Sequence, residues 1–116
     1  MTGETTENQD VWILDQRIDH IGPSGERPIP SSVKVVDVTD HYLIPGLVDS
    51  HVHLDHVEEL PLYLARGVTT VFNLRGVPHH LEWRDAVARG DRLGPTIYTC
   101  GDYLDGNPPY MEPMLN

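Results

Sequence analysis

Two histidines separated by one residue, His51 and His53, are the side chains whose types and spacing best suit metal chemistry in this sequence. They close an apolar segment, LIPGLVDSHVHL, that spans residues 43–54. Alternate side chains of a strand share a face, with Cα atoms roughly 6.6 Å apart, so the two imidazoles can converge on one ion. Zinc binds imidazole nitrogen at about 2.0–2.1 Å. We therefore predict that His51 and His53 are metal ligands.

The residues around the pair sharpen this prediction. Val52 and Leu54 should face the opposite way, into an apolar layer under helices. Asp49 has the same parity as the histidines, and its carboxylate would either accept a ring N–H and fix the tautomer of a ligand or bond to backbone. Two exposed histidines at a chance spacing are the alternative for the pair itself. The pair ends an apolar strand that begins with Pro-Gly, and it lies at the carboxyl end, where barrel enzymes place their chemistry. This position favours the metal site.

The elements that must position the pair come from the pattern after residue 42, where strands and helices alternate as in parallel β-α-β units. Pro61 should delay the first helix until after Leu60, and Gly67 and Gly90 suit helix C-caps. In barrels of such units, the chemistry lies at the carboxyl ends of the strands. We predict strands at 47–53, 68–74 and 96–100 and helices at 57–66 and 81–89.

The first 41 residues read differently, as short strands with turns between them. Residues 1–10 are polar and predict a frayed tail. Residues 11–14 and 18–21 predict the two strands of a hairpin, and the β-branched run at 33–38 predicts a third strand. Three short strands do not close a core of their own.

The formal net charge of −10 argues against nucleic acid or an anionic membrane as a partner, because an acidic surface is repelled by phosphate. No apolar stretch approaches the roughly 20 residues that span a bilayer. Cys100 is the single cysteine, which makes a reduced, cytoplasmic setting the simpler interpretation. With 116 residues the chain is far short of the roughly 250 that a complete eight-fold barrel needs.

Several segments in order resemble the amidohydrolase superfamily of metal-dependent hydrolases. IPGLVDSHVH at 44–53 is similar to the signature that opens its barrel, GVTTV at 67–71 to its second strand and GPTIYTCG at 94–101 to its third. Residues 84–90 resemble the helix between those strands, and residues 18–23 and 35–37 resemble a small β-sandwich flap. The resemblance covers roughly residues 11 to 108.

The resemblance implies an α/β fold: the start of a (β/α)8 TIM barrel, about three β/α units in residues 42–116, preceded by part of the flap in residues 11–41. His51 and His53 would bind the more buried metal, Zn²⁺ or another divalent ion, of a mono- or binuclear centre. The other ligands, among them the carboxylated lysine of the family's fourth strand, and the catalytic aspartate would lie beyond Asn116. Lys34 lies upstream of the barrel and cannot replace that lysine. No catalytic residue is therefore expected in this chain.

The activity implied by the family is hydrolysis of a C–N bond in a small-molecule substrate, an amide, cyclic amide or peptide, by a metal-activated water. An N-terminal portion of such an enzyme should be inactive alone, and its partner would be the remaining barrel or a second copy. Two alternatives stay open. The chain could be a small non-enzymatic α/β binding module, or an independent metal protein that adds His56 to His51 and His53.

Other polar and aromatic residues are weaker candidates. His56, His79 and His80 are expected in loops as solvated side chains. Asn73 and Arg75, at the end of the second barrel strand, either reach substrate or cap the strand. The remaining candidates are Asp102, Tyr103 and Asp105, as a pocket wall or a self-bonded loop, and Trp12 and Trp83, as packing residues.

Overall fold

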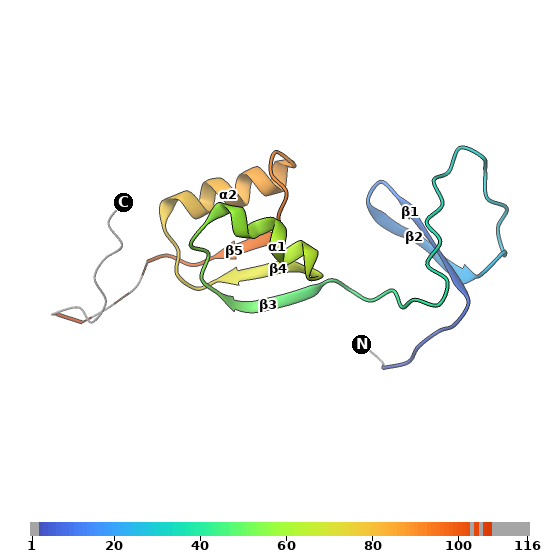
Figure 1. The fold of residues 1–116 in the computed structure, drawn as a ribbon, viewed down its shortest axis with the longest axis horizontal. Coiled ribbons are helices and arrows are strands. Elements are labelled where there is room, and N and C mark those ends of the chain that lie inside the picture. The colour runs from blue at the N-terminus through green and yellow to red at the C-terminus, as the bar shows by residue number, and fades with distance from the viewer. Residues whose placement is uncertain (1–2, 103, 105, 108–116) are drawn as a thin grey trace. The chain divides into compact units, whose positions relative to one another are not determined.

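The computed structural model describes residues 3–102, 104 and 106–107, and the chain divides into two compact units after Tyr42. Figure 1 labels the elements of both. The first unit holds a two-stranded antiparallel sheet, and the second holds a three-stranded sheet with two α-helices.

The first unit is built on a β-hairpin, as predicted. Strands β1 (Gln9–Leu14) and β2 (Arg17–Pro23) pair antiparallel, with Leu14 opposite Arg17. Asp15 and Gln16 between them both have positive φ, the feature of a type I′ turn, whose twist matches that of the flanking strands. Because β1 begins at Gln9, the predicted tail is two residues too long.

The third strand predicted for this unit, at residues 33–38, is wrong. These residues are exposed and form no strand, in spite of their β-branched side chains. A strand needs a partner for its backbone groups and a surface on which to bury alternate side chains, and the described hairpin supplies neither to this segment. The β-propensity of the run was therefore overridden by the absence of a neighbour.

The second unit contains three parallel strands in the order in which they occur along the chain. These are β3 (Leu47–Val52), β4 (Val68–Asn73) and β5 (Thr96–Thr99). All three strands predicted for this part of the chain are present, each one residue shorter at its carboxyl end. His53 thereby lies just outside the strand that was predicted to include it.

The helices connect these strands and confirm the predicted glycine stops. A 3₁₀ turn η1 (Val57–Glu59) leads into α1 (Leu60–Ala65), one residue earlier than predicted, because Pro61 is tolerated in the first turn of a helix. The second helix, α2 (Pro78–Arg89), begins three residues before the predicted start, with Pro78 as its first residue. Gly67 and Gly90 follow the two helices with φ of 80° and 79°.

The core lies between the sheet and the two helices. It is formed by five buried side chains: Val52, Leu54, Leu60, Val71 and Ile97. Trp83 packs against this core, as predicted. The opposite face of the sheet carries Phe72 stacked on Tyr98, with ring centroids 4.9 Å apart. Paired residues thus alternate between the two faces: Val71 and Ile97 lie inside, and Phe72 and Tyr98 outside.

These elements make the described chain a small α/β protein with one antiparallel and one parallel sheet, and its described residues form no closed barrel. The α/β part of the predicted fold class is confirmed. Neither helix in the described part of the chain is long and apolar enough to cross a bilayer.

Candidate metal centre and its supporting network

His51 and His53 lie together at the carboxyl end of β3, on the side away from the core. Both side chains are exposed, whereas Val52 and Leu54, which alternate with them, are 6% and 2% exposed. The two imidazole rings meet edge to face, with centroids 5.3 Å apart and planes at 73°. The two rings share one face of the strand and their neighbours are buried, both as predicted, and binding of a common ion stays a prediction.

The arrangement of the rings suits a shared metal ion. Two imidazoles that bind one zinc at the tetrahedral angle, with Zn–N of about 2.0–2.1 Å, have ring centroids about 5 Å apart. The observed separation of 5.3 Å is close to that value. Among the described residues, neither ring is engaged in a hydrogen bond, so in each neutral ring the unprotonated nitrogen is available to bind a metal ion.

Asp49 does not lie where the alternation predicted. The register between β3 and β4 is irregular between Asp49 and Val52, and Asp49 pairs with the buried Val71. Its carboxylate accepts the backbone N–H of His51 at 3.2 Å, which was the alternative to a bond with an imidazole. A β-bulge of this kind shifts the parity of a strand, so residues 49 and 51 no longer share a face.

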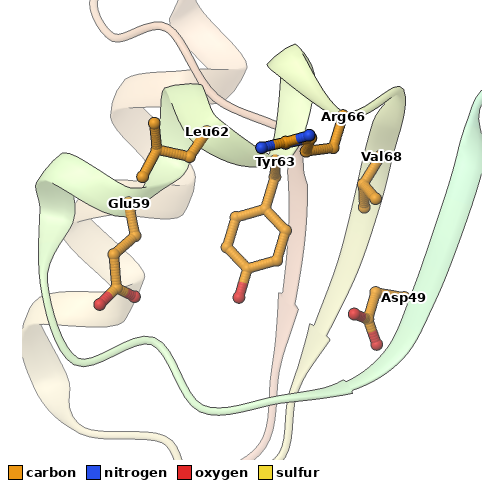
Figure 2. A pocket seen from close by; sticks show the side chains of 6 residues that line it. All are labelled: Asp49, Glu59, Leu62, Tyr63, Arg66 and Val68. Atoms are coloured by element: carbon orange, nitrogen blue, oxygen red, sulfur yellow. The ribbon is translucent and has the colours of Figure 1, made fainter.

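The position of Asp49 on the helix side of the sheet is also seen in a shallow pocket beneath α1. Figure 2 shows Asp49 and Tyr63 among the residues that line it, with Glu59 and Arg66 at its sides. Burial, followed by the charges of Glu59 and Asp49, raises the pKa of Tyr63. Asp49 therefore belongs to the helix side of the sheet, away from the exposed imidazoles.

His56 does not complete a three-histidine site. It is exposed in the segment between β3 and η1. No group of three or more His, Cys, Asp or Glu side chains that could hold a metal occurs among residues 3–102, 104 and 106–107. The pair would supply two ligands, and a catalytic zinc site commonly has three from protein.

The prediction that His80 is a solvated loop residue is wrong, because His80 lies in the first turn of α2 and is only 2% exposed. Its Nδ1 accepts the backbone N–H of Val77 at 3.1 Å and an N–H of the Asn73 amide at 2.9 Å. With Nδ1 accepting twice, the ring proton is on Nε2, which donates to the carbonyl of Leu54 at 2.7 Å. Burial, the largest cause, lowers the pKa of His80 and favours this neutral form.

Asn73 is the second member of this buried network and is fully inaccessible to solvent. Its Oδ1 accepts the backbone N–H of Leu54 at 3.1 Å, and its Nδ2 donates to the Arg75 carbonyl and to Thr99 Oγ1, at 2.9 and 3.1 Å. Asn73 thus closes the end of its strand and is not at a surface that substrate could reach. The network spans β4, β5, α2 and the chain after β3.

Gly76 lets these elements approach one another. A Cβ at this position would collide with the carbonyl oxygen of Cys100, and the Gly76 N–H instead donates to the Gly101 carbonyl at 3.1 Å. The ends of β4 and β5 are therefore joined by backbone as well as by the side chains of Asn73 and Thr99.

Arg75, the other predicted substrate contact, forms an ion pair with Asp55 and leaves 17% of its side chain exposed. This pair joins the segments after β4 and β3. Of the loop candidates, Asp102 is exposed, while Tyr103 and Asp105 lie outside the described residues. The prediction of a solvated loop residue is also wrong for His79, which lies in α2 and is half-buried beside Trp83, with ring centroids 4.7 Å apart. Contact of Arg75 or Asp102 with a substrate stays a prediction.

The comparisons with known proteins confirm the resemblance to the amidohydrolase superfamily, since the relatives include adenine deaminases and a dihydroorotase, both members of it. No protein-family model matches the chain. The chain is 32% identical over 76 residues to adenine deaminase 3 of Rhizobium meliloti (strain 1021), an alignment that covers 61% of this chain and 13% of that protein.

Two further relatives show the same partial coverage. Adenine deaminase 1 of Jannaschia sp. (strain CCS1) is 32% identical over 91 residues, which are 66% of this chain and 15% of that protein. The dihydroorotase of Mycobacterium tuberculosis (strain ATCC 25618 / H37Rv) is 46% identical over 48 residues, 41% of this chain and 11% of that protein. The chain therefore spans a small part of the length of the relatives that it matches.

Sequence reasoning missed the role of Asn73 and His80 as a buried pair. The available signal was weak: Pro78 at a helix start places His80 at the third helical position, where capping-box residues bond back to the N-cap N–H. Histidine is unusual in that role, and its burial depends on the neighbouring strands. Local patterns do not reveal such an arrangement.

Proposed function

We propose that the chain is the opening part of a metal-dependent hydrolase barrel, with His51 and His53 as two ligands of a divalent ion, zinc being the first candidate. The observation that carries this proposal is the pair of exposed imidazoles with ring centroids 5.3 Å apart. The parallel order β3-β4-β5 supports assigning residues 42–116 to the first three units of a (β/α)8 barrel. The hairpin unit, residues 11–41, would be part of the flap.

The pair would serve as neutral nitrogen ligands at the carboxyl end of a strand. A divalent ion held there would lower the pKa of a coordinated water towards neutrality and would polarise the group under attack. His51 is fixed by the strand and by the bond from its N–H to Asp49, and His53 follows directly after the strand. Both rings keep an exposed side towards which a substrate can approach.

The bond broken is proposed to be C–N, in a small molecule. Deamination breaks a carbon–nitrogen bond, and the relatives named as adenine deaminases support this choice. The remaining metal ligands and the general base would come from chain beyond Asn116, so we expect the 116 residues alone to have no hydrolytic activity. A cytoplasmic location and a homo-oligomer stay predictions.

Zinc titration of the labelled chain, followed by NMR of the histidine ring ¹³C–¹H signals, tests the metal role. We expect the His51 and His53 signals to shift together, and either H51A or H53A to remove the effect at the remaining ring. His56→Ala is the matched control, because His56 is an exposed histidine of the same segment and should leave the titration unchanged. Equal weakening by H56A would support the three-histidine alternative. No shift at either ring would overturn the metal role and favour a non-enzymatic binding module.

A further inference from the structure

We propose that Asn73 and His80 are positioning residues for the histidine pair, acting through the backbone of Leu54. This inference rests on the proposed metal role of His51 and His53. It assigns a task to two buried polar side chains that do not themselves reach the exposed face of the sheet.

The two side chains hold both polar backbone groups of one residue. Asn73 Oδ1 accepts the Leu54 N–H at 3.1 Å, and His80 Nε2 donates to the Leu54 carbonyl at 2.7 Å. The Leu54 side chain is 2% exposed and belongs to the core. Leu54 is thus fixed at its N–H, its carbonyl and its side chain, which leaves it little freedom to rotate.

Leu54 matters because His53 immediately precedes it and lies outside the sheet ladder. Strand β3 ends at Val52, whose carbonyl accepts the N–H of Leu74 at 3.1 Å. His53 is therefore held between two fixed neighbours. Val52 is part of the strand pairing, and Leu54 is held at its N–H and its carbonyl by Asn73 and His80, two bonds that we call the clamp. A metal site needs its ligands within about 0.5 Å of the productive geometry, which an unsupported loop residue does not provide.

The clamp is itself rigid, because its members are anchored on different elements. Asn73 also donates to Thr99 on β5, and His80 also accepts the Val77 N–H at the start of α2. Among the described residues, every buried side-chain polar atom has a hydrogen-bond partner. A fully satisfied buried network of this kind specifies one arrangement of the chain.

The test compares His80→Leu, which removes the donor to Leu54, with His80→Gln, whose amide can still donate to that carbonyl. Asn73→Leu removes the other half of the clamp. Val71→Ala is the matched control, because Val71 is fully buried on the same face of β4 but bonds to nothing in the network. Two quantities are measured in each variant: the zinc dissociation constant at the His53 ring, and the NOE between the rings of His51 and His53.

We expect His80→Leu and Asn73→Leu to weaken zinc binding about tenfold, the lower end of the range for residues that orient metal ligands. Both should lose the ring–ring NOE. His80→Gln should recover most of the affinity and the NOE, and Val71→Ala should change neither, even where it lowers stability.

The proposal is overturned if His80→Leu keeps the NOE and the affinity, or if Val71→Ala reduces them as much. Should Asn73→Leu fail to fold, the contrast between His80→Leu and His80→Gln still decides. The NOE needs no metal, so it judges the positioning role even where zinc does not bind. Loss of the metal role alone would instead appear as a wild-type titration that leaves both rings unshifted.

Discussion

Two pairs of histidines near the same end of the parallel sheet differ in almost everything except residue type. His51 and His53 are exposed, and their rings contact each other without a hydrogen bond among the described residues. His80, beside the half-buried His79, is 2% exposed and bonded at both ring nitrogens. The first pair has free nitrogen donors, whereas His80 has none left for a ligand.

The difference shows that burial decides whether a histidine has a structural role or remains able to bind a metal ion. A buried imidazole must satisfy its nitrogens within the protein, because an unpaired buried polar group costs about 1–3 kcal/mol. An exposed imidazole bonds to water and can exchange it for a metal ion. Substitutions in the buried network should therefore act on stability as well as on the position of the exposed pair, whereas substitutions at the exposed pair should act on zinc binding and leave stability almost unchanged.

Asn73→Leu should have the largest effect on stability. It leaves the Leu54 N–H and the Thr99 hydroxyl without the Asn73 partner in a buried site, and we expect a loss of about 3 kcal/mol or more in the free energy of unfolding. Urea unfolding followed by circular dichroism measures this change. Asn107→Leu makes the same substitution at an exposed position and should cost less than about 0.5 kcal/mol. Similar losses in the two variants would contradict the structural role of Asn73.

His80 should make the stability depend on pH. Burial lowers its pKa in the folded chain, so below the ordinary value of about 6.5 the unfolded chain binds a proton more readily than the folded chain does. Stability is therefore retained above that value and lost as the pH falls through the folded-state pKa. Urea unfolding between pH 7.5 and pH 5 should show a smaller decline for His80→Gln than for the natural chain. Equal declines would mean that His80 does not contribute.

The buried network also marks the limit of what the sequence predicted. The strands and helices of residues 43–100 follow from apolar periodicity, prolines at helix starts and glycines at helix ends, which are local signals. The exposure of His51 and His53 follows from strand alternation. Asp49 could not be placed in this way, because the β-bulge between it and Val52 depends on pairing with β4. Asn73 and His80 could not be either, because their partners lie up to 26 residues away.

Asp55→Asn tests the ion pair between the segments that follow β3 and β4, and its effect on stability should be smaller. Arg75 and Asp55 join the segments after β4 and β3, but half of the Asp55 side chain is exposed. Ion pairs of this kind contribute about 0–1 kcal/mol and are screened by salt. Unfolding in urea at low and high sodium chloride should show a loss below about 1 kcal/mol that shrinks with salt. Asp91→Asn, in an exposed pair with Arg89, is the control and should change less.

The smallest effect on stability is expected at the exposed pair, in the variants His51→Ala and His53→Ala. Neither ring is buried or bonded within the described residues, so each substitution should change the free energy of unfolding by less than about 0.5 kcal/mol. Zinc should raise the unfolding midpoint of the natural chain, because a ligand that binds only the folded state stabilises it, and this rise should vanish in both variants. In urea without zinc, His80→Ala should by contrast lower the free energy of unfolding by about 2 kcal/mol, because it removes the hydrogen-bond partner of three buried or partly buried groups. If His51→Ala destabilised the chain as strongly as His80→Ala, the exposed pair would be structural too, and the contrast on which the metal proposal depends would be lost.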